Sequence, residues 1–151
     1  MPRASNNQMH FLQCHGIELP KPQRQAGSLW QPKKWFERDA AAIIAYLREG
    51  NGAGKGGTLE ERRALYQAAR QKYEGQFVVK KSGEDCARYL VLCLIPESQE
   101  HLAWVAEHRG VDPSQVNPFC FDMVAEEDPA DYDGHIRGPV NLGDYRLPDE
   151  E

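Results

Sequence analysis

Hydrophobic positions along the chain concentrate in one central run that ends at a proline. Residues 86–95 read CARYLVLCLI, and Pro96 follows. In an extended chain, successive side chains point to opposite faces, and here both faces would be mainly apolar. This pattern is typical of a strand buried on both faces, although a short buried helix has nearly the same pattern. We favour a strand because a second apolar run, at residues 76–81, precedes it across a turn-forming segment at residues 82–85.

Two segments upstream have the apolar spacing of amphipathic helices. The first covers residues 32–49 and ends before Gly50, a residue type that commonly terminates helices. The second covers residues 59–74 and opens after Thr58, which can cap its first turn. We expect Leu65 in the buried stripe of this second helix.

Downstream, the pattern predicts a third helix over residues 98–109 and a strand over residues 119–124. The predicted fold class is α+β, with a small antiparallel sheet centred on residues 86–95 and packed against two to three helices. The predicted core residues are Trp30, Trp35, Phe36, Ile43, Leu47, Leu65, Tyr73, Phe77, Val79, Leu90, Leu92, Leu94, Val105 and Phe119.

The ends of the chain have weaker patterns. Residues 1–31 are polar and rich in proline, which predicts an irregular, extended N-terminal arm. Residues 32–124 form the predicted globular α+β domain. Residues 125–151 form a predicted acidic C-terminal segment, rich in turn-forming residues.

Charge divides the sequence more sharply than its net value of −5 suggests. Residues 1–81 contain 14 Lys and Arg against 7 Asp and Glu, whereas residues 82–151 contain 4 against 16. Two interpretations follow. Either the halves neutralise each other within the fold, or one of them meets a charged partner.

The sequence does not match the catalytic and cofactor-binding motifs that its residues first suggest. The glycine-rich loop contains Gly54 and Lys55, but Glu49 stands where a P-loop needs its first glycine, and the loop joins two predicted helices. His10, Cys14 and His15 do not have the spacing of a zinc module. We therefore predict no catalytic residue, no metal ligand and no cofactor.

The leading hypothesis is a non-enzymatic binding or inhibitory protein that docks on a basic surface of a partner protein. A nucleic-acid-processing machine is one such partner, because its channels must be cationic, and an inhibitor of phage or mobile-element type would compete with the nucleic acid. The expected partner-binding residues are acidic: Glu126, Glu127, Asp128, Asp131 and Asp133.

One alternative is a nucleic-acid-binding protein that uses the basic N-terminal half, because cations neutralise phosphates and aromatic faces stack on bases. Its candidate residues are Lys33, Lys34, Arg38, Lys55, Arg62, Arg63 and Trp35. Another alternative is a small enzyme or metal protein with an unrecognised site. No apolar segment approaches the length of a membrane span and the N-terminus lacks a hydrophobic leader, so we expect a cytoplasmic protein with no membrane partner; its oligomeric state stays open.

Overall fold

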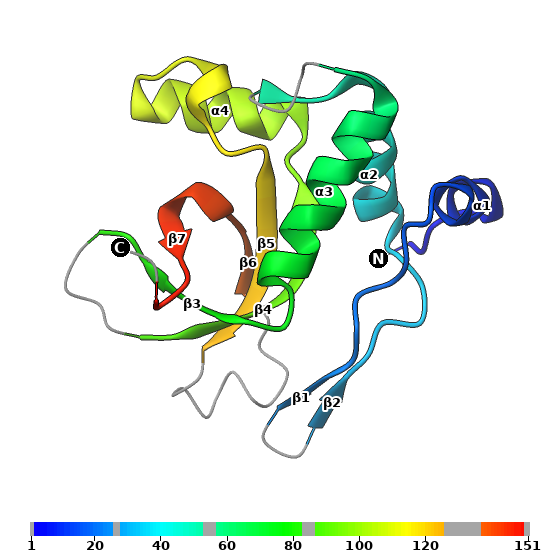
Figure 1. Ribbon diagram of the computed structural model, residues 1–151, viewed down its shortest axis with the longest axis horizontal. Coiled ribbons are helices and arrows are strands. Elements are labelled where there is room, and N and C mark those ends of the chain that lie inside the picture. The colour runs from blue at the N-terminus through cyan, green and yellow to red at the C-terminus, as the bar shows by residue number, and fades with distance from the viewer. Residues whose placement is uncertain (1, 26–27, 53–56, 83–86, 126–136, 150–151) are drawn as a thin grey trace.

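The computed structural model describes residues 2–25, 28–52, 57–82, 87–125 and 137–149. Within these ranges, groups of helices and groups of strands follow one another along the chain (Figure 1). The elements are α1 (Asn6–Cys14), β1 (Gln23–Gln25), β2 (Ser28–Trp30), α2 (Glu37–Glu49), α3 (Leu59–Tyr73), β3 (Phe77–Lys80), β4 (Tyr89–Pro96), α4 (Gln99–Arg109), β5 (Phe119–Ala125), β6 (Arg137–Asn141) and β7 (Tyr145–Arg146).

An antiparallel five-stranded sheet with the order β6-β5-β4-β3-β7 forms the centre of the fold. Its middle strand is β4, in which every residue is buried. The predicted α+β class and the predicted central strand are therefore confirmed. Helices α2 and α3 both contact β4 and each other, and a separate two-stranded hairpin, β1-β2, extends from the same side (Figure 1).

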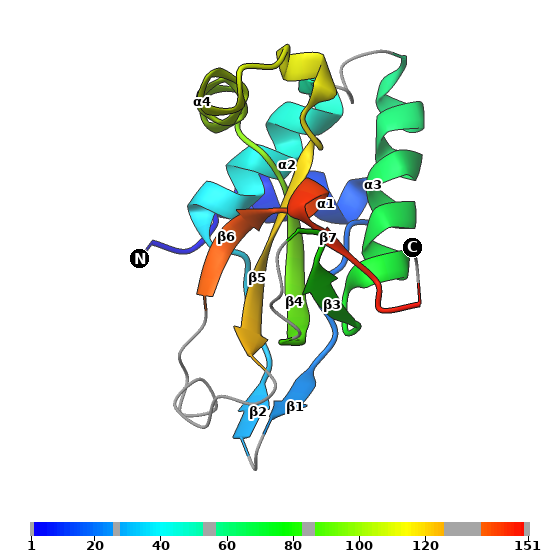
Figure 2. The ribbon, with the colours of Figure 1, turned by 90° about the vertical axis from the view of Figure 1, so that its left-hand side faces the viewer.

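The sheet curls because its two edge strands are close in sequence. Strand β6 ends at Asn141 and β7 begins at Tyr145, with only the short 3-10 helix η3 (Leu142–Asp144) between them. A connection of this length spans at most about 15 Å. The ring of Tyr145 consequently lies 5.2 Å from that of Phe121 on β5 and 6.0 Å from that of Tyr89 on β4, and Figure 2 shows β6 and β7 joined across the sheet.

The N-terminal segment is not the extended arm that its composition predicted. Residues 6–14 form helix α1, because Ser5 and Gln8 make a reciprocal capping box at its first turn. Leu12 is fully buried in the main core, and α1 packs against α2. The predicted start of the next helix also shifts, because the backbone at Trp35 and Phe36 pairs with Ala4 and Arg3, so that α2 begins only at Glu37.

The predicted acidic segment contributes to the sheet. Residues 137–146 supply β6 and β7, the two edge strands. The stretch between β5 and β6, residues 126–136, lies outside the described residues.

The buried face of α3 differs from its predicted apolar stripe. Leu65 is 54 % exposed, whereas Arg62, Tyr66 and Arg70 are buried. These three residues are four apart and share one face of the helix. The arginines are accommodated because each has several acceptors, so the sequence pattern alone assigned the wrong residue to the interior.

Most other predicted core residues lie inside. Trp35, Ile43, Leu47, Leu90, Leu92, Leu94, Val105 and Phe119 are buried, whereas Phe36, Tyr73, Phe77 and Val79 are half-buried. The side chain of Trp30 lies outside the described side chains. None of the helices in the described ranges is long and apolar enough to cross a bilayer.

Candidate functional site

Between α2 and the start of α4 lies a cleft of about 600 Å³, which we call the α2–β5 cleft. Its walls are one side of α2, residues 95–101, and the side chains of Cys120, Asp122 and Pro139. The cleft therefore forms where the end of β4, the start of α4 and strand β5 meet the helix that covers the sheet.

Acidic side chains dominate the charge of this cleft. One guanidinium, that of Arg38, lies at its edge with 68 % of the side chain exposed, and its Nε atom is 4.0 Å from Oδ1 of Asp39. Five carboxylates also line the cleft: Asp39, Glu49, Glu97, Glu100 and Asp122. Their field attracts cations.

Two of the carboxylates are partly removed from water and repel each other. Burial, together with the negative charge of Asp39, raises the pKa of Asp122 to about 6, although Arg38 opposes this shift. Burial also raises the pKa of Asp39 above its ordinary value, again against the effect of Arg38. A cation placed between Asp39 and Asp122 would stabilise both ionised forms.

A buried polar network fixes the inner end of the cleft. Only 1 % of the Glu97 side chain is exposed; its Oε2 contacts Nδ1 of His101, and its Oε1 accepts a hydrogen bond from Nδ2 of Asn141 at 3.3 Å. The backbone carbonyl of Glu97 accepts a second hydrogen bond, from Nδ2 of Asn51 at 2.6 Å. These contacts join β4, α4, β6 and the end of α2 at one point.

Two buried polar atoms in the cleft wall have no hydrogen-bond partner within the described part of the chain. They are Oδ1 of Asn51 and the hydroxyl of Tyr46, and each residue is only 2 % exposed. The orientation of the Asn51 amide is fixed, since its Nδ2 donates to the carbonyls of both Glu97 and Pro118. A buried acceptor left without a donor costs free energy, so these two atoms mark a polar point in the wall that the described protein groups do not satisfy.

Cys120 also lines the cleft, but its thiol is poorly suited to attack a substrate. Burial and the negative charges of Glu97 and Asp122 raise its pKa well above the ordinary value for a thiol. The Sγ atom donates a hydrogen bond to the carbonyl of Ile95 at 3.4 Å. Because the thiolate is the nucleophilic form, this environment favours binding chemistry over cysteine catalysis.

The acidic residues predicted to bind a partner, Glu126, Glu127, Asp128, Asp131 and Asp133, lie outside the described residues. In sequence they continue directly from β5, the strand that carries Asp122. The structure therefore places a different acidic group, formed by residues distant in sequence, at a definite site.

The basic residues of the nucleic-acid alternative that the structure describes do not all lie on one surface. Arg62 and Trp35 are buried in the interior, and Lys55 lies outside the described residues. Arg63 pairs with Glu60 at 3.0 Å on α3. Exposed Lys33 and half-buried Lys34 precede α2, and Arg38 lies in its first turn beside the cleft.

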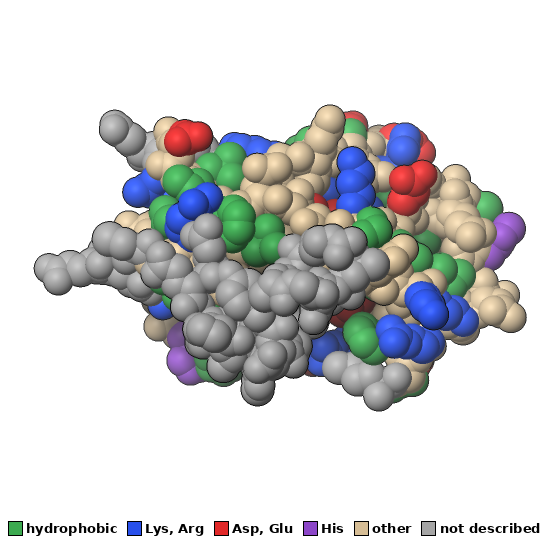
Figure 3. All heavy atoms as spheres, turned by 90° about the horizontal axis from the view of Figure 1, so that it is seen from below, with side chains coloured by type: hydrophobic (Ala, Val, Ile, Leu, Met, Phe, Trp, Pro, Cys, Tyr) green, Lys and Arg blue, Asp and Glu red, His purple; other side chains and the backbone are tan. Residues whose placement is uncertain are grey.

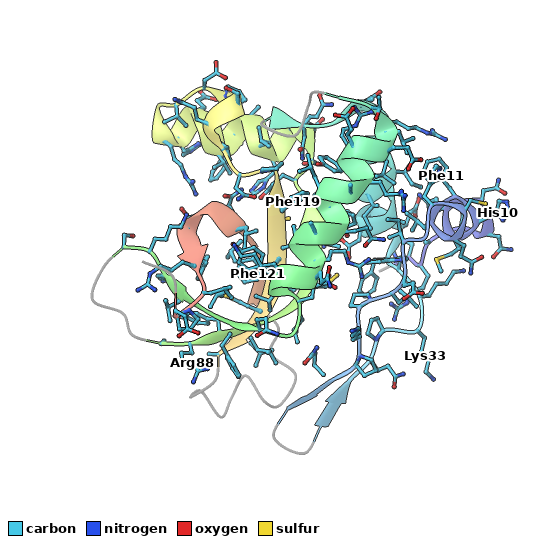
Figure 4. The ribbon with its side chains drawn as sticks, in the orientation of Figure 1. His10, Phe11, Lys33, Arg88, Phe119 and Phe121 are labelled. Atoms are coloured by element: carbon cyan, nitrogen blue, oxygen red, sulfur yellow. The ribbon has the colours of Figure 1, made fainter. Side chains whose placement is uncertain are left out.

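Figure 3 shows one face of the molecule on which Lys and Arg side chains lie at several separate places, some of them beside carboxylates. Figure 4 places Lys33 near the segment that leads into α2, far from Arg88 at the opposite side of the view. The separation of the sequence into a basic and an acidic half therefore does not appear as a basic side and an acidic side among the described residues of this face.

The potential metal ligands of the N-terminus are only partly brought together. Nε2 of His10 lies 3.4 Å from Sγ of Cys14 on α1, and Figure 4 shows His10 at the outer edge of the molecule. The ring of His15 instead packs against that of Phe11, with an interplanar angle of 45°. Within the described ranges, no group of three or more His, Cys, Asp or Glu side chains could hold a metal ion.

The cleft was not predicted from the sequence, because its carboxylates come from segments far apart in the chain. One signal was present: Asp122 interrupts the otherwise apolar strand FCFDMVA. A carboxylate within a buried strand needs a local reason, and here that reason is the cleft.

Comparison of this chain with protein-family models, with curated proteins and with solved structures found no match.

Proposed function

We propose that this chain is a non-enzymatic binding protein that docks on a basic surface of a partner protein, with the α2–β5 cleft at the centre of the contact. The observation that carries this proposal is the composition of the cleft, in which five carboxylates face a single guanidinium at the edge. Such a concentration of one sign of charge steers an oppositely charged partner and selects against acidic ones.

An exposed aromatic side chain beside the cleft supports the same proposal. Trp104 on α4 is 54 % exposed, and its ring stacks on that of His101 at 5.8 Å with an interplanar angle of 10°. His101 itself lines the cleft. Tryptophan is enriched among the residues that anchor protein interfaces, so Trp104 supplies an apolar contact next to the electrostatic one.

The charge of the cleft supports one class of partner. A nucleic-acid-processing machine presents cationic channels, and an acidic protein docked there would exclude nucleic acid. This is the mode of action that we propose, an inhibitor of phage or mobile-element type.

The test compares wild type with the double variant Asp39→Asn and Asp122→Asn. Each immobilised protein is exposed to host lysate with and without nuclease treatment, and the captured protein is identified, purified and titrated at 50 and 300 mM salt. We expect capture that survives nuclease, affinity about tenfold weaker at 300 mM salt, and loss of binding in the double variant.

The matched control is Asp149→Asn, which removes an exposed carboxylate outside the cleft and should bind as wild type does. Salt-insensitive binding, or capture that depends on nucleic acid, would overturn the proposal.

A further inference from the structure

We propose that the group received by the α2–β5 cleft is a guanidinium, so that the partner inserts an arginine side chain. This inference rests on the proposed function and adds the chemical identity of the inserted group. It depends on the number, placement and surroundings of the acceptors in the cleft.

The acceptors lie on different walls. Asp39 belongs to α2, Asp122 to β5, and the unpartnered Oδ1 of Asn51 to the segment that follows α2. A guanidinium carries five N–H donors that diverge in one plane, whereas an ammonium carries three on a single atom. The planar group can therefore direct separate donors at the two carboxylates, which a point charge does less well.

The rest of the wall suits the stem of an arginine. Small or apolar residues occupy it on both sides: Ala41, Ala42, Ala45, Ile95, Pro96 and Pro139. A chain of methylene groups can pack along such a surface while its charged end reaches the carboxylates. The guanidinium is also more weakly hydrated than an ammonium, so its transfer into a partly dry cleft costs less.

Such a group would favour the ionised forms of both carboxylates. Partial burial and the negative charge of Asp39 raise the pKa of Asp122, partial burial raises the pKa of Asp39, and the positive charge of Arg38 remains mostly in solvent. An arriving guanidinium would supply the countercharge that these two carboxylates lack.

The experiment titrates the full-length protein with three small probes and follows backbone amide chemical shifts. The probes are N-acetyl-arginine amide, N-acetyl-lysine amide and N-acetyl-citrulline amide, which has nearly the shape of arginine but no charge. We expect saturable shifts at the cleft for arginine, affinity at least about fivefold weaker for lysine, and no saturation for citrulline.

Asp122→Asn should weaken the arginine probe at least about tenfold, while Asp149→Asn should leave its affinity unchanged. Since removal of a buried charge is expected to stabilise the fold, a loss of binding in Asp122→Asn will not reflect unfolding, and the amide spectrum of the variant verifies this.

The outcomes separate this inference from the proposed function. Equal affinity for arginine and lysine, or shifts confined to carboxylates outside the cleft, would overturn the guanidinium inference while a basic partner protein still binds. Arginine binding with no basic partner protein would instead support the inference and overturn the proposed docking function.

Discussion

The guanidinium of Arg62 lies in the interior, where it donates to backbone carbonyls at the C-terminal end of α2. Its Nη2 atom donates to the carbonyls of Leu47 and Arg48 at 2.8 and 2.9 Å, and its Nη1 atom to that of Gly57 at 2.8 Å. The last carbonyls of a helix have no partner within the helix, and a cation there also complements the helix dipole. Arg62 therefore joins α3 to α2 and is not available to bind nucleic acid.

Replacement of Arg62 by Met should destabilise the protein by about 3 kcal/mol, because several buried carbonyls would lose their donor. The matched control is Arg63→Met, which removes a cation from a partly exposed pair with Glu60 and should cost less than about 0.5 kcal/mol. Urea unfolding of both variants measures the difference. Similar losses for both would show that Arg62 does not act as a structural cap.

Asp122 should make the stability of the protein depend on pH in an unusual direction. Its pKa in the folded state is about 6, above the ordinary value of 3.8, so folding opposes its ionisation. The resulting destabilisation is absent below about pH 3.8, grows between pH 3.8 and 6, and is complete above that range.

Asp122→Asn should therefore stabilise the protein by about 2 kcal/mol at pH 7.5, after allowance for the partial exposure of the side chain, and by almost nothing at pH 3.5. Urea midpoints of variant and wild type at the two pH values test this. A stabilisation that is equal at both would mean that the carboxylate is not desolvated in the folded protein.

Among the elements, β6 and β7 show where local sequence stops determining structure. The run YLVLCLIP of β4 has no charged residue and is buried at every position, so few structures other than a buried strand suit it. Residues 137–146 read RGPVNLGDYR, with two glycines and a proline. They become strands because β5 and β3 each offer an edge, a condition that no local pattern contains.

The same reasoning explains the other differences from prediction. The capping pattern of Ser5 and Gln8 was visible in the sequence, but the polar composition around it outweighed so short a signal. The buried arginines of α3 could not be recognised, because acceptors distant in sequence complete their contacts: carbonyls at the end of α2 for Arg62, and the carbonyl of Glu18 for Arg70. The fold class and the central strand were predictable, whereas the cleft required the tertiary arrangement.

Leu142 tests the importance of the β6-η3-β7 connection. It is 4 % exposed and belongs to the main core, so Leu142→Ala should cost about 3 kcal/mol. Leu65→Ala makes the same chemical change at a site that is 54 % exposed, and it should cost less than about 0.5 kcal/mol. Thermal unfolding compares them. Equal small losses would indicate that the closing segment contributes little to the fold.

In the folded molecule, the described parts of the basic and acidic halves of the sequence do not form two oppositely charged sides. Instead, both halves contribute carboxylates to the α2–β5 cleft. Asp39 and Glu49 belong to the basic half, and Glu97, Glu100 and Asp122 to the acidic half. The cations, in contrast, are divided among the interior, ion pairs and separate surface positions. Among the described residues, the fold thus brings carboxylates together at the cleft and leaves the cations at separate places.

Dispersed cations should bind nucleic acid weakly, since each phosphate contact adds to the salt-dependent affinity only where the cations align along a backbone. We expect a fluorescent single-stranded DNA of about 20 nucleotides, a length above the site size of one binding domain, to show no saturable anisotropy change at 150 mM salt. The double variant Lys33→Glu and Lys34→Glu should behave as wild type does. If wild type binds saturably and this variant does not, the basic segment before α2 is a nucleic-acid site. The nucleic-acid-binding function would then be favoured over docking through the cleft.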